Sequence, residues 1–172
     1  MAHHAIHPNQ AGFMPGQSIF DQVKLARMMV NYAEVTQKDG FIVALDQEKA
    51  YDKISHDYLW RSLGKYNIHP RFIHTVKSLY ESAETRVIIN GVVSSPFQVS
   101  RGVRQGDPLS CLLFNLGIEP LANLLRKSNR YGYPIPGSDD RLITTLFAND
   151  TTVYLDKRNS YDELLSILGL WC

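Results

Sequence analysis

The sequence predicts an α+β fold in which helices back an antiparallel sheet. Two hairpin signals carry this prediction: Asn90-Gly91 joins two β-branched runs, and a corner from Phe147 to Asp150 joins two more. Amphipathic helical stretches separate them, and hairpins form antiparallel rather than parallel strand pairs. With 172 residues and 44% hydrophobic content, the chain can form one domain or part of a larger one.

The first half of the chain predicts three helices and one strand. Apolar residues recur at helical spacing over residues 17–35, which predicts an amphipathic helix. The apolar run 41–45 predicts a buried strand that places Asp46 just past its last residue. Two short helices are expected over 58–66 and 70–80, and the second begins with a proline, which needs no N–H partner in the first turn.

The second half begins with a hairpin and a long helix. Residues 85–89 and 92–100 are the expected strands, because Asn-Gly between them accepts positive φ at both positions. The helix that follows reaches residue 127, and Asp107 is its expected cap.

The remaining residues predict a loop, a hairpin and a last helix. Residues 129–141 are rich in proline and glycine and are expected to form a loop. Residues 142–155 form the second hairpin. Ser160 and Glu163 have the spacing of a capping box, which predicts a helix to the end of the chain.

Charge is balanced overall but not locally. The chain has 18 Lys and Arg against 17 Asp and Glu, so no global basic field points to a polyanionic partner. Residues 61–104 are the exception, with seven basic and two acidic side chains. The basic ones are Arg61, Lys65, Arg71, Lys77, Arg86, Arg101 and Arg104. Such a cluster is either a nucleic-acid contact surface or an ordinary solvated face.

Cysteine usage and hydropathy predict the compartment. Cys111 and Cys172 have neither metal-site nor disulfide-framework spacing, which favours a reducing interior. No run of 18 apolar residues and no signal peptide is recognised, so we expect an intracellular protein, nuclear or cytoplasmic, without a membrane partner. His3, His4 and His7 are interpreted as solvent-exposed residues near a chain end rather than as metal ligands.

Two carboxylates reach comparable positions from distant parts of the chain. Asp46 follows the first expected strand, and Asp150 ends the corner of the second hairpin. If these strands are neighbours, the side chains lie side by side, and such like charges repel unless a cation lies between them. Hard divalent ions take oxygen ligands of this kind. Considered separately, each aspartate is more simply a turn residue.

Three stretches resemble motifs A, B and C of the reverse transcriptases of non-LTR (LINE-type) retrotransposons. They are FIVALDQEKAYDKISHDYLWRSL, RGVRQGDPLSCLLFNLGIEPL and LFANDTTVYL, and IHPNQAGFMPGQSIFDQV resembles the segment before motif A. The resemblance implies the partial fingers and palm of a right-hand polymerase, here an RNA-directed DNA polymerase. It also implies an RNA template, a DNA primer and deoxynucleoside triphosphates as partners.

The resemblance also divides residues 1–172 into parts. These are a fingers-side segment at 1–40, motif A at 41–66, a hairpin with motif B at 85–128, the motif C hairpin at 141–156 and a truncated last helix at 160–172. A thumb, an endonuclease and an RNase H segment are not expected within it. The fragment is therefore expected to polymerise poorly by itself.

Metal roles follow from the same resemblance. Asp46 and Asp150 are the expected ligands, with the backbone carbonyl of Gln47 as a further oxygen donor. Two Mg²⁺ ions are expected, with Mn²⁺ as a substitute, because two-metal catalysis activates the attacking hydroxyl and stabilises in-line displacement at phosphorus.

Nucleotide and nucleic-acid contacts are implied elsewhere. Tyr51 resembles the family's steric gate against a ribose 2′-hydroxyl, although a core aromatic is an equal reading. Gln105 and Gly106 are expected at the nucleotide, while Gly102 allows close backbone approach and Pro108 rigidifies the helix start. The expected nucleic-acid contacts are Arg86, Arg101 and Arg104.

Asn149 departs from the family pattern, in which motif C carries two adjacent acids. Its amide offers one neutral oxygen where a carboxylate offers two charged ones. Unit charges about 4 Å apart interact by roughly 4 kcal/mol at an effective dielectric of about 20. If all of this energy is lost from the transition state, the rate falls roughly a thousandfold. We expect impaired catalysis, and the alternative is a catalytically silent nucleic-acid-binding module. An RNA-directed RNA polymerase is disfavoured by Tyr51.

Overall fold

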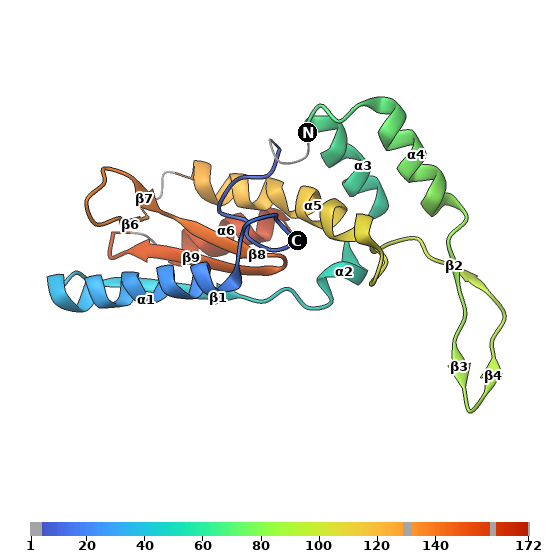
Figure 1. Ribbon diagram of the computed structural model, residues 1–172, viewed down its shortest axis with the longest axis horizontal. Helices are drawn as coiled ribbons and strands as arrows, with labels where there is room; N and C mark the ends of the chain where they lie inside the picture. Colours follow the sequence, from blue (N-terminus) through green and yellow to red (C-terminus); the bar gives the residue numbers. More distant parts are fainter. Residues whose placement is uncertain (1–4, 129–131, 159–160, 172) are drawn as a thin grey trace. The chain divides into compact units, whose positions relative to one another are not determined.

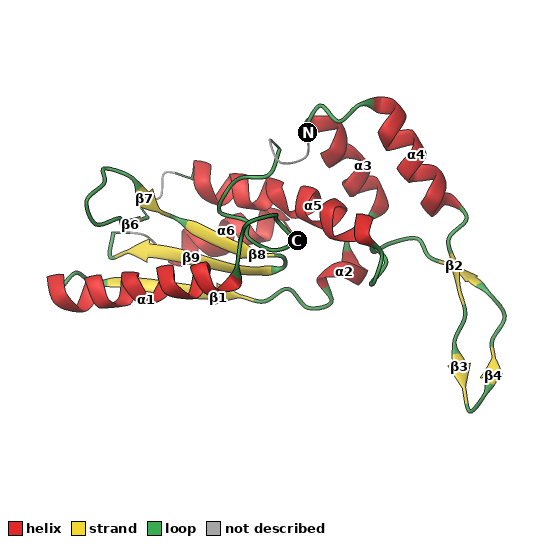
Figure 2. Ribbon diagram, viewed as in Figure 1, coloured by secondary structure: helices red, strands yellow, loops and turns green. Residues whose placement is uncertain are grey.

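The computed structural model describes residues 5–128, 132–158 and 161–171, which form two compact units (Figure 1). Met1–Glu48 and Ile118–Cys172 form the first, called the sheet unit, and Lys49–Gly117 form the second, called the helical unit. Runs of helices and runs of strands follow one another along the chain (Figure 2), and the strand pairs are antiparallel, so the α+β prediction is confirmed.

The sheet unit is built on three antiparallel strands. They are β1 (Gly40–Leu45), β8 (Thr144–Phe147) and β9 (Asp150–Asp156), in the order β1-β9-β8. The β8–β9 hairpin was predicted from its two β-branched runs, and it is confirmed. In the register of β1 with β9, Gly40 pairs with Asp156 and Leu45 pairs with Thr151. The carboxyl end of β1 therefore lies at the hairpin corner.

Residues 41–45 form the predicted strand, but the prediction that this strand is buried is wrong. β1 is an edge strand, paired only with β9, and Phe41 and Ile42 are 61% and 45% exposed. An apolar run identifies a strand but not how many neighbours cover it.

Helix α1 (Ile19–Thr36) confirms the helix expected at 17–35. It begins at Ser18, whose side chain accepts a hydrogen bond from the N–H of Phe20. Its buried Met29 packs in a core cluster with Tyr133 and Tyr154.

Two further elements complete the sheet unit. The loop expected at 129–141 contains a short antiparallel pair, β6 (Tyr133–Pro134) with β7 (Arg141–Leu142), which the sequence did not indicate. Residues 129–131 of that loop lie outside the described residues. The last helix is confirmed as α6 (Tyr161–Trp171), while the expected cap Ser160, like Cys172, His3 and His4, lies outside them.

The helical unit contains three helices and two short strand pairs before α5. The helices are α2 (Ala50–Lys53), α3 (His56–Lys65) and α4 (Pro70–Glu81). The pairs are β2 (Glu84–Thr85) with β5 (Phe97–Gln98), and β3 (Ile88–Ile89) with β4 (Val92–Val93). α4 and α3 confirm the two expected short helices, whereas the four-residue α2 was not predicted.

The first hairpin is confirmed at its turn but not along its length. Asn90 and Gly91 both have positive φ, at 50° and 80°, and join Ile89 to Val92 in register. The continuous strands expected over 85–89 and 92–100 are interrupted instead into two-residue pairs, because the ladder breaks between β2 and β3 and between β4 and β5.

Helix α5 (Pro108–Lys127) contributes residues to both units. Its predicted cap is confirmed, since Oδ1 of Asp107 accepts a hydrogen bond from the N–H of Leu109 at 2.9 Å. By length and composition α5 could cross a membrane. However, 61% of its most apolar 18-residue stretch is buried inside the fold, as in an ordinary core helix.

Candidate active site

The structure brings Asp46 and Asp150 together in the sheet unit. Asp46 directly follows β1 and Asp150 opens β9, so both residues lie next to the last pair of the antiparallel register, Leu45 with Thr151. Nδ2 of Asn149 lies 3.5 Å from Oδ1 of Asp46 and 3.4 Å from Oδ1 of Asp150. The two carboxylate oxygens are therefore no farther apart than the sum of these distances.

This pair of acids suits a hard divalent cation. Both side chains are exposed, so ions reach them from solvent. Carboxylate oxygens are the ligands that Mg²⁺ prefers in proteins, usually one or two together with substrate phosphates. Within the described ranges no group of three or more His, Cys, Asp and Glu side chains gathers, so the protein's charged ligands here number two.

Asn149 turns a donor, not an acceptor, toward the acids. Its Nδ2 contacts with Asp46 and Asp150 are long for hydrogen bonds, so they hold the amide weakly. A half-turn of the terminal amide presents Oδ1 instead, as a single neutral ligand. Gln47, half-buried, follows Asp46 directly, and the ligand role of its backbone carbonyl stays a prediction.

Tyr51 lies in the helical unit as a stacked, half-buried aromatic. Its ring stacks on Phe114 with centroids 4.6 Å apart and an interplanar angle of 13°. Burial first, and then the neighbouring Cys111, raises the pKa of the Tyr51 phenol above its usual value, so the side chain is neutral. The stack supports the reading as a core aromatic, while the role of steric gate stays a prediction.

The loop before α5 is fastened to the α2–α3 segment. The N–H of Gly102 donates to the carbonyl of Ile54, and that of Val103 to the carbonyl of Tyr51, both at 2.8 Å. Nε2 of His56 lies 2.9 Å from the carbonyl oxygen of Gly102. Gly102 has a φ of 87°, and a Cβ there would lie 3.0 Å from the carbonyl oxygen of Tyr51, so glycine is required by the chain's own backbone.

Three other predicted residues of this loop have little around them. Gln105 and Gly106 are exposed, and Gly106 has a φ of 87° with open space around it. Pro108 is the first residue of α5, as expected. Their roles toward a nucleotide stay predictions.

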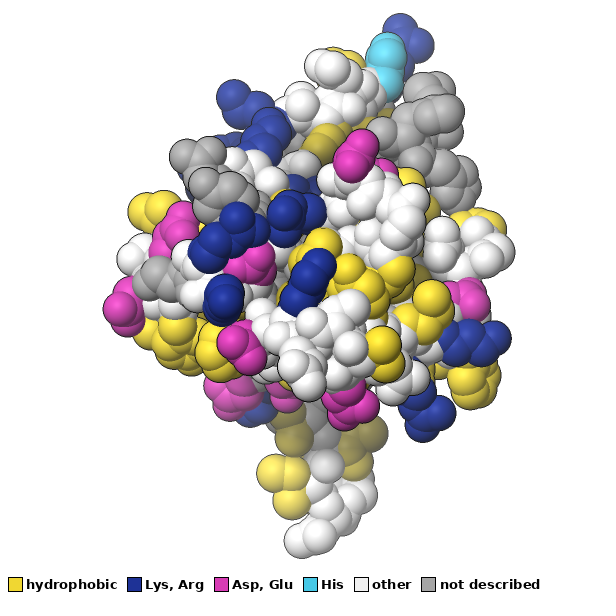
Figure 3. Space-filling model, turned by 90° about the vertical axis from the view of Figure 1, so that its left-hand side faces the viewer, with side chains coloured by type: hydrophobic (Ala, Val, Ile, Leu, Met, Phe, Trp, Pro, Cys, Tyr) yellow, Lys and Arg dark blue, Asp and Glu magenta, His cyan; other side chains and the backbone are white. Residues whose placement is uncertain are grey.

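The predicted basic residues differ in how the fold uses them. Arg86 and Arg101 are exposed. The guanidinium of Arg104 lies 5.7 Å from the centre of the Tyr80 ring and donates to the carbonyl of Leu79 at 3.3 Å. Arg104 therefore packs against α4, and Arg86 and Arg101 are the freer candidates for phosphate contacts. Acidic and basic side chains are interspersed on the face shown in Figure 3.

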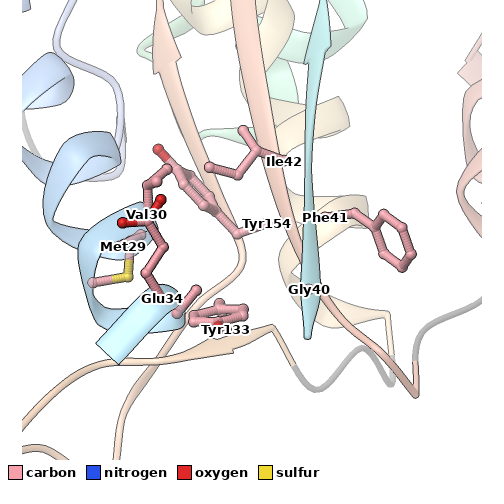
Figure 4. A pocket seen from close by; sticks show the side chains of 9 residues that line it. Met29, Val30, Glu34, Gly40, Phe41, Ile42, Tyr133 and Tyr154 are labelled. Atoms are coloured by element: carbon pink, nitrogen blue, oxygen red, sulfur yellow. The ribbon is translucent and has the colours of Figure 1, made fainter. Parts of the chain in front are cut away.

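A pocket lies elsewhere in the sheet unit (Figure 4). It has a volume of about 200 Å³ and is lined mainly by apolar and aromatic side chains, among them Met29, Tyr133 and Tyr154. Gly40 and Phe41 also line it, so it lies at the opposite end of β1 from Asp46. It is not part of the candidate active site.

Sequence reasoning gave no role to Gln10 and His56, two residues that hold the site's loops. Gln10 is 1% exposed and contacts the hairpin corner, and His56 contacts Gly102. The only signal for Gln10 was its place in the segment that resembles the one before motif A. A polar residue's burial depends on distant parts of the chain, which a local pattern does not reveal.

Comparisons with known proteins identify the family of the chain. The sequence profile described as "Reverse transcriptase (RNA-dependent DNA polymerase)" matches residues 1–172. The chain is 41% identical over 145 residues, 84% of its length, to the "Transposon TX1 uncharacterized 149 kDa protein" of Xenopus laevis. It is 30% identical over 169 residues, 95% of its length, to the "Retrovirus-related Pol polyprotein from type-2 retrotransposable element R2DM" of Drosophila melanogaster. These matches cover 11% and 16% of the two relatives, so the chain spans a small part of their length.

Proposed function

The chain belongs to the reverse transcriptase family, as a domain of the non-LTR retrotransposon type, and we propose that its sheet unit is the palm of a right-hand polymerase. The proposed reaction is the extension of a DNA primer by deoxynucleotides on an RNA template. The observation that carries the proposal is the meeting of Asp46 and Asp150 around one amide nitrogen at the β8–β9 corner.

The residues at this corner have distinct proposed tasks. Asp46, Asp150 and the backbone carbonyl of Gln47 hold divalent cations, Mg²⁺ or its substitute Mn²⁺. When bound, the cations make the primer 3′-hydroxyl more acidic and stabilise charge at the transferred phosphorus. In the helical unit, Tyr51 excludes a ribose 2′-hydroxyl, and Gln105 and Gly106 contact the incoming nucleotide.

Asn149 weakens the proposed site without altering its shape. An amide has a single neutral oxygen, and in the arrangement described its N–H group faces both acids. For Asn149 to act as a ligand, its amide must therefore turn, and it then supplies one negative charge fewer than an aspartate would. We propose reduced metal affinity and a correspondingly reduced rate.

A metal titration tests this proposal. We expect Asn149→Asp to lower the dissociation constant for Mn²⁺, followed by electron paramagnetic resonance, by at least about tenfold, since an added charge near 4 Å is worth more than 1.4 kcal/mol. Asp46→Asn in the Asn149→Asp background should abolish the gain. The matched control is Asp156→Asn, which removes a carboxylate from the other end of β9 and should leave Mn²⁺ binding unchanged.

The contrary outcome favours a second function. The donor that Asn149 presents to both acids favours a site that no longer needs metal, in a module that only binds nucleic acid. If neither the wild-type chain nor Asn149→Asp binds Mn²⁺ at millimolar concentrations, while primer-template binding persists, that module is the better description.

A further inference from the structure

Gln10 binds the hairpin corner with both ends of its side-chain amide. Its Oε1 accepts a hydrogen bond from the N–H of Ala148 at 2.9 Å, and its Nε2 donates to the carbonyl of Ala148 at 3.2 Å. The same Oε1 accepts a second hydrogen bond, from the N–H of Gly12 at 2.9 Å. Gln10 is 1% exposed, so these bonds are shielded from water and the loss of a partner would leave a buried polar group unsatisfied.

The backbone around Gln10 extends the sheet toward the same corner. The carbonyl of Asn9 accepts from the N–H of Leu146, and the N–H of Ala11 donates to the carbonyl of Leu146, both at 2.8 Å. Gln10 thereby forms a parallel bridge with Leu146 on the free edge of β8. Strand β8 ends one residue later, at Phe147, and the Gln10 side chain supplies the next donor and acceptor where the ladder stops.

Gly12 shows how closely this segment approaches the corner. A Cβ at Gly12 would lie 2.1 Å from the nitrogen of Ala148 and 2.9 Å from the carbonyl carbon of Phe147. Both neighbours are backbone atoms and have no freedom to move aside. A glycine is therefore needed for the segment to lie against the corner.

Ala148 needs such support. Its φ is 55°, a left-handed conformation that non-glycine residues rarely adopt, at the first central position of the two-residue turn. Tight hairpins with positive φ only at this position normally carry glycine there. Hydrogen bonds to both polar groups of Ala148 compensate for the strain and fix the peptide that leads into Asn149 and Asp150.

We propose that Gln10 is a positioning residue that clamps the Ala148 peptide and thereby sets the placement of Asn149 and Asp150 opposite Asp46. The part of this inference that is measured by Mn²⁺ binding rests on the proposed function. The clamp itself, measured by amide exchange of Ala148, does not depend on a metal. Gln10 touches neither acid, so its effect passes through the backbone of the corner.

Gln10→Met tests the clamp, because methionine keeps the length and removes both polar ends. We expect the amide hydrogen of Ala148, followed by NMR in D₂O, to exchange at least about tenfold faster in the variant. In the Asn149→Asp background, the dissociation constant for Mn²⁺ should rise about tenfold. Gln10→Glu keeps an acceptor for Ala148 and Gly12 and should give intermediate values.

Asn9→Ala is the matched control. Its Nδ2 donates to the carbonyl of Thr144 at 2.9 Å, so the variant loses a hydrogen bond from the same segment to the same strand, but away from the corner. We expect it to lower the melting temperature while Ala148 exchange and Mn²⁺ affinity stay near their original values. Equal effects of Asn9→Ala and Gln10→Met would reduce Gln10 to a structural role and overturn the proposal.

The two readouts separate the clamp from the function. Unchanged protection of Ala148 in both Gln10→Met and Gln10→Glu overturns the clamp, whatever the metal does. Faster exchange with unchanged Mn²⁺ affinity overturns the claim that the clamp sets the acids. If Asn149→Asp with intact Gln10 binds no Mn²⁺, the metal site of the proposed function fails, and Ala148 exchange still decides the clamp.

Discussion

Asp156, at the end of β9 remote from the hairpin corner, is the carboxylate whose charge the fold stabilises most clearly. Arg158 donates to it at 2.6 Å, and Arg141 lies 3.7 Å from it. These partners, first of all the hydrogen bond from Arg158, lower the pKa of Asp156 to about 2. The ionised form is thus favoured in the folded chain over the unfolded one.

The sign of this shift predicts a pH dependence. A carboxyl group with a lowered pKa contributes stability that is present above its ordinary pKa, about 3.9, and is lost as the pH falls toward 2. We therefore expect Asp156→Asn to lower the free energy of unfolding at pH 7 and to have a shrinking effect below pH 4. Urea unfolding across this range measures it.

Asp139→Asn is the control for that series. Asp139 is an exposed residue of the loop before β7, and its replacement should leave the free energy of unfolding within about 0.5 kcal/mol of the wild-type value. An effect of Asp156→Asn that stays constant from pH 7 to pH 2.5 would contradict the role of its charge.

Single residues also show what sequence reasoning could and could not reach. Asp46 and Asp150 were predictable because one directly follows a strand and the other lies at a hairpin corner, and the antiparallel pairing of the two strands then sets their proximity. Gln10 was not, because its importance comes from Ala148, far along the chain. The contact of His56 with Gly102 is non-local in the same way. Local patterns predict which residues adjoin a site but not which buried amide holds it.

At the scale of elements, α5 carries a buried ion pair that its apolar composition hides. Glu119 is 1% exposed and forms an ion pair with Arg126, which lies about two turns farther along the same face of the helix. Arg126 also donates to Oδ1 of Asn123 at 3.0 Å. Burial raises the pKa of Glu119, while Arg126 acts in the opposite direction. Arg126 therefore offsets part of the cost of burying this carboxyl group.

Arg126→Met should be strongly destabilising. It leaves Glu119 buried without its counter-charge, which typically costs about 3–5 kcal/mol. Urea unfolding at pH 7 measures this loss. The double variant Glu119→Leu with Arg126→Met removes both charges and should recover most of the stability, so a double variant as unstable as Arg126→Met would show that the arginine acts through packing and not through the pair.

Elements were predicted well where their signals are local. The cap of α5 and the turn at Asn90-Gly91 lie within a few residues of what they control, and both are confirmed. The exposure of β1 and the β6–β7 pair depend on strands elsewhere in the chain, and both were missed. Pairing partners are long-range information that a sequence window does not contain.

At the scale of the whole molecule, the two units divide the proposed work. The sheet unit holds the acids, and the helical unit holds the basic cluster of residues 61–104 together with Tyr51 and the loop before α5. The overall charge of +1 gives no long-range attraction for nucleic acid. Binding to a primer-template must therefore depend on local contacts, chiefly from the exposed arginines of the helical unit.

Salt dependence measures those contacts. Replacing both Arg86 and Arg101 by alanine should weaken binding of a fluorescent primer-template and reduce the slope of log K against log salt by about 1.4–1.8, since each phosphate contact contributes roughly 0.7–0.9. Removing Lys127 and Lys157, exposed basic residues outside the cluster, should change the slope less. Arg104→Ala should instead lower stability, because it loses its packing on Tyr80. Equal slopes in the arginine and lysine double variants would mean that the cluster is a solvated face and that nucleic acid binds elsewhere.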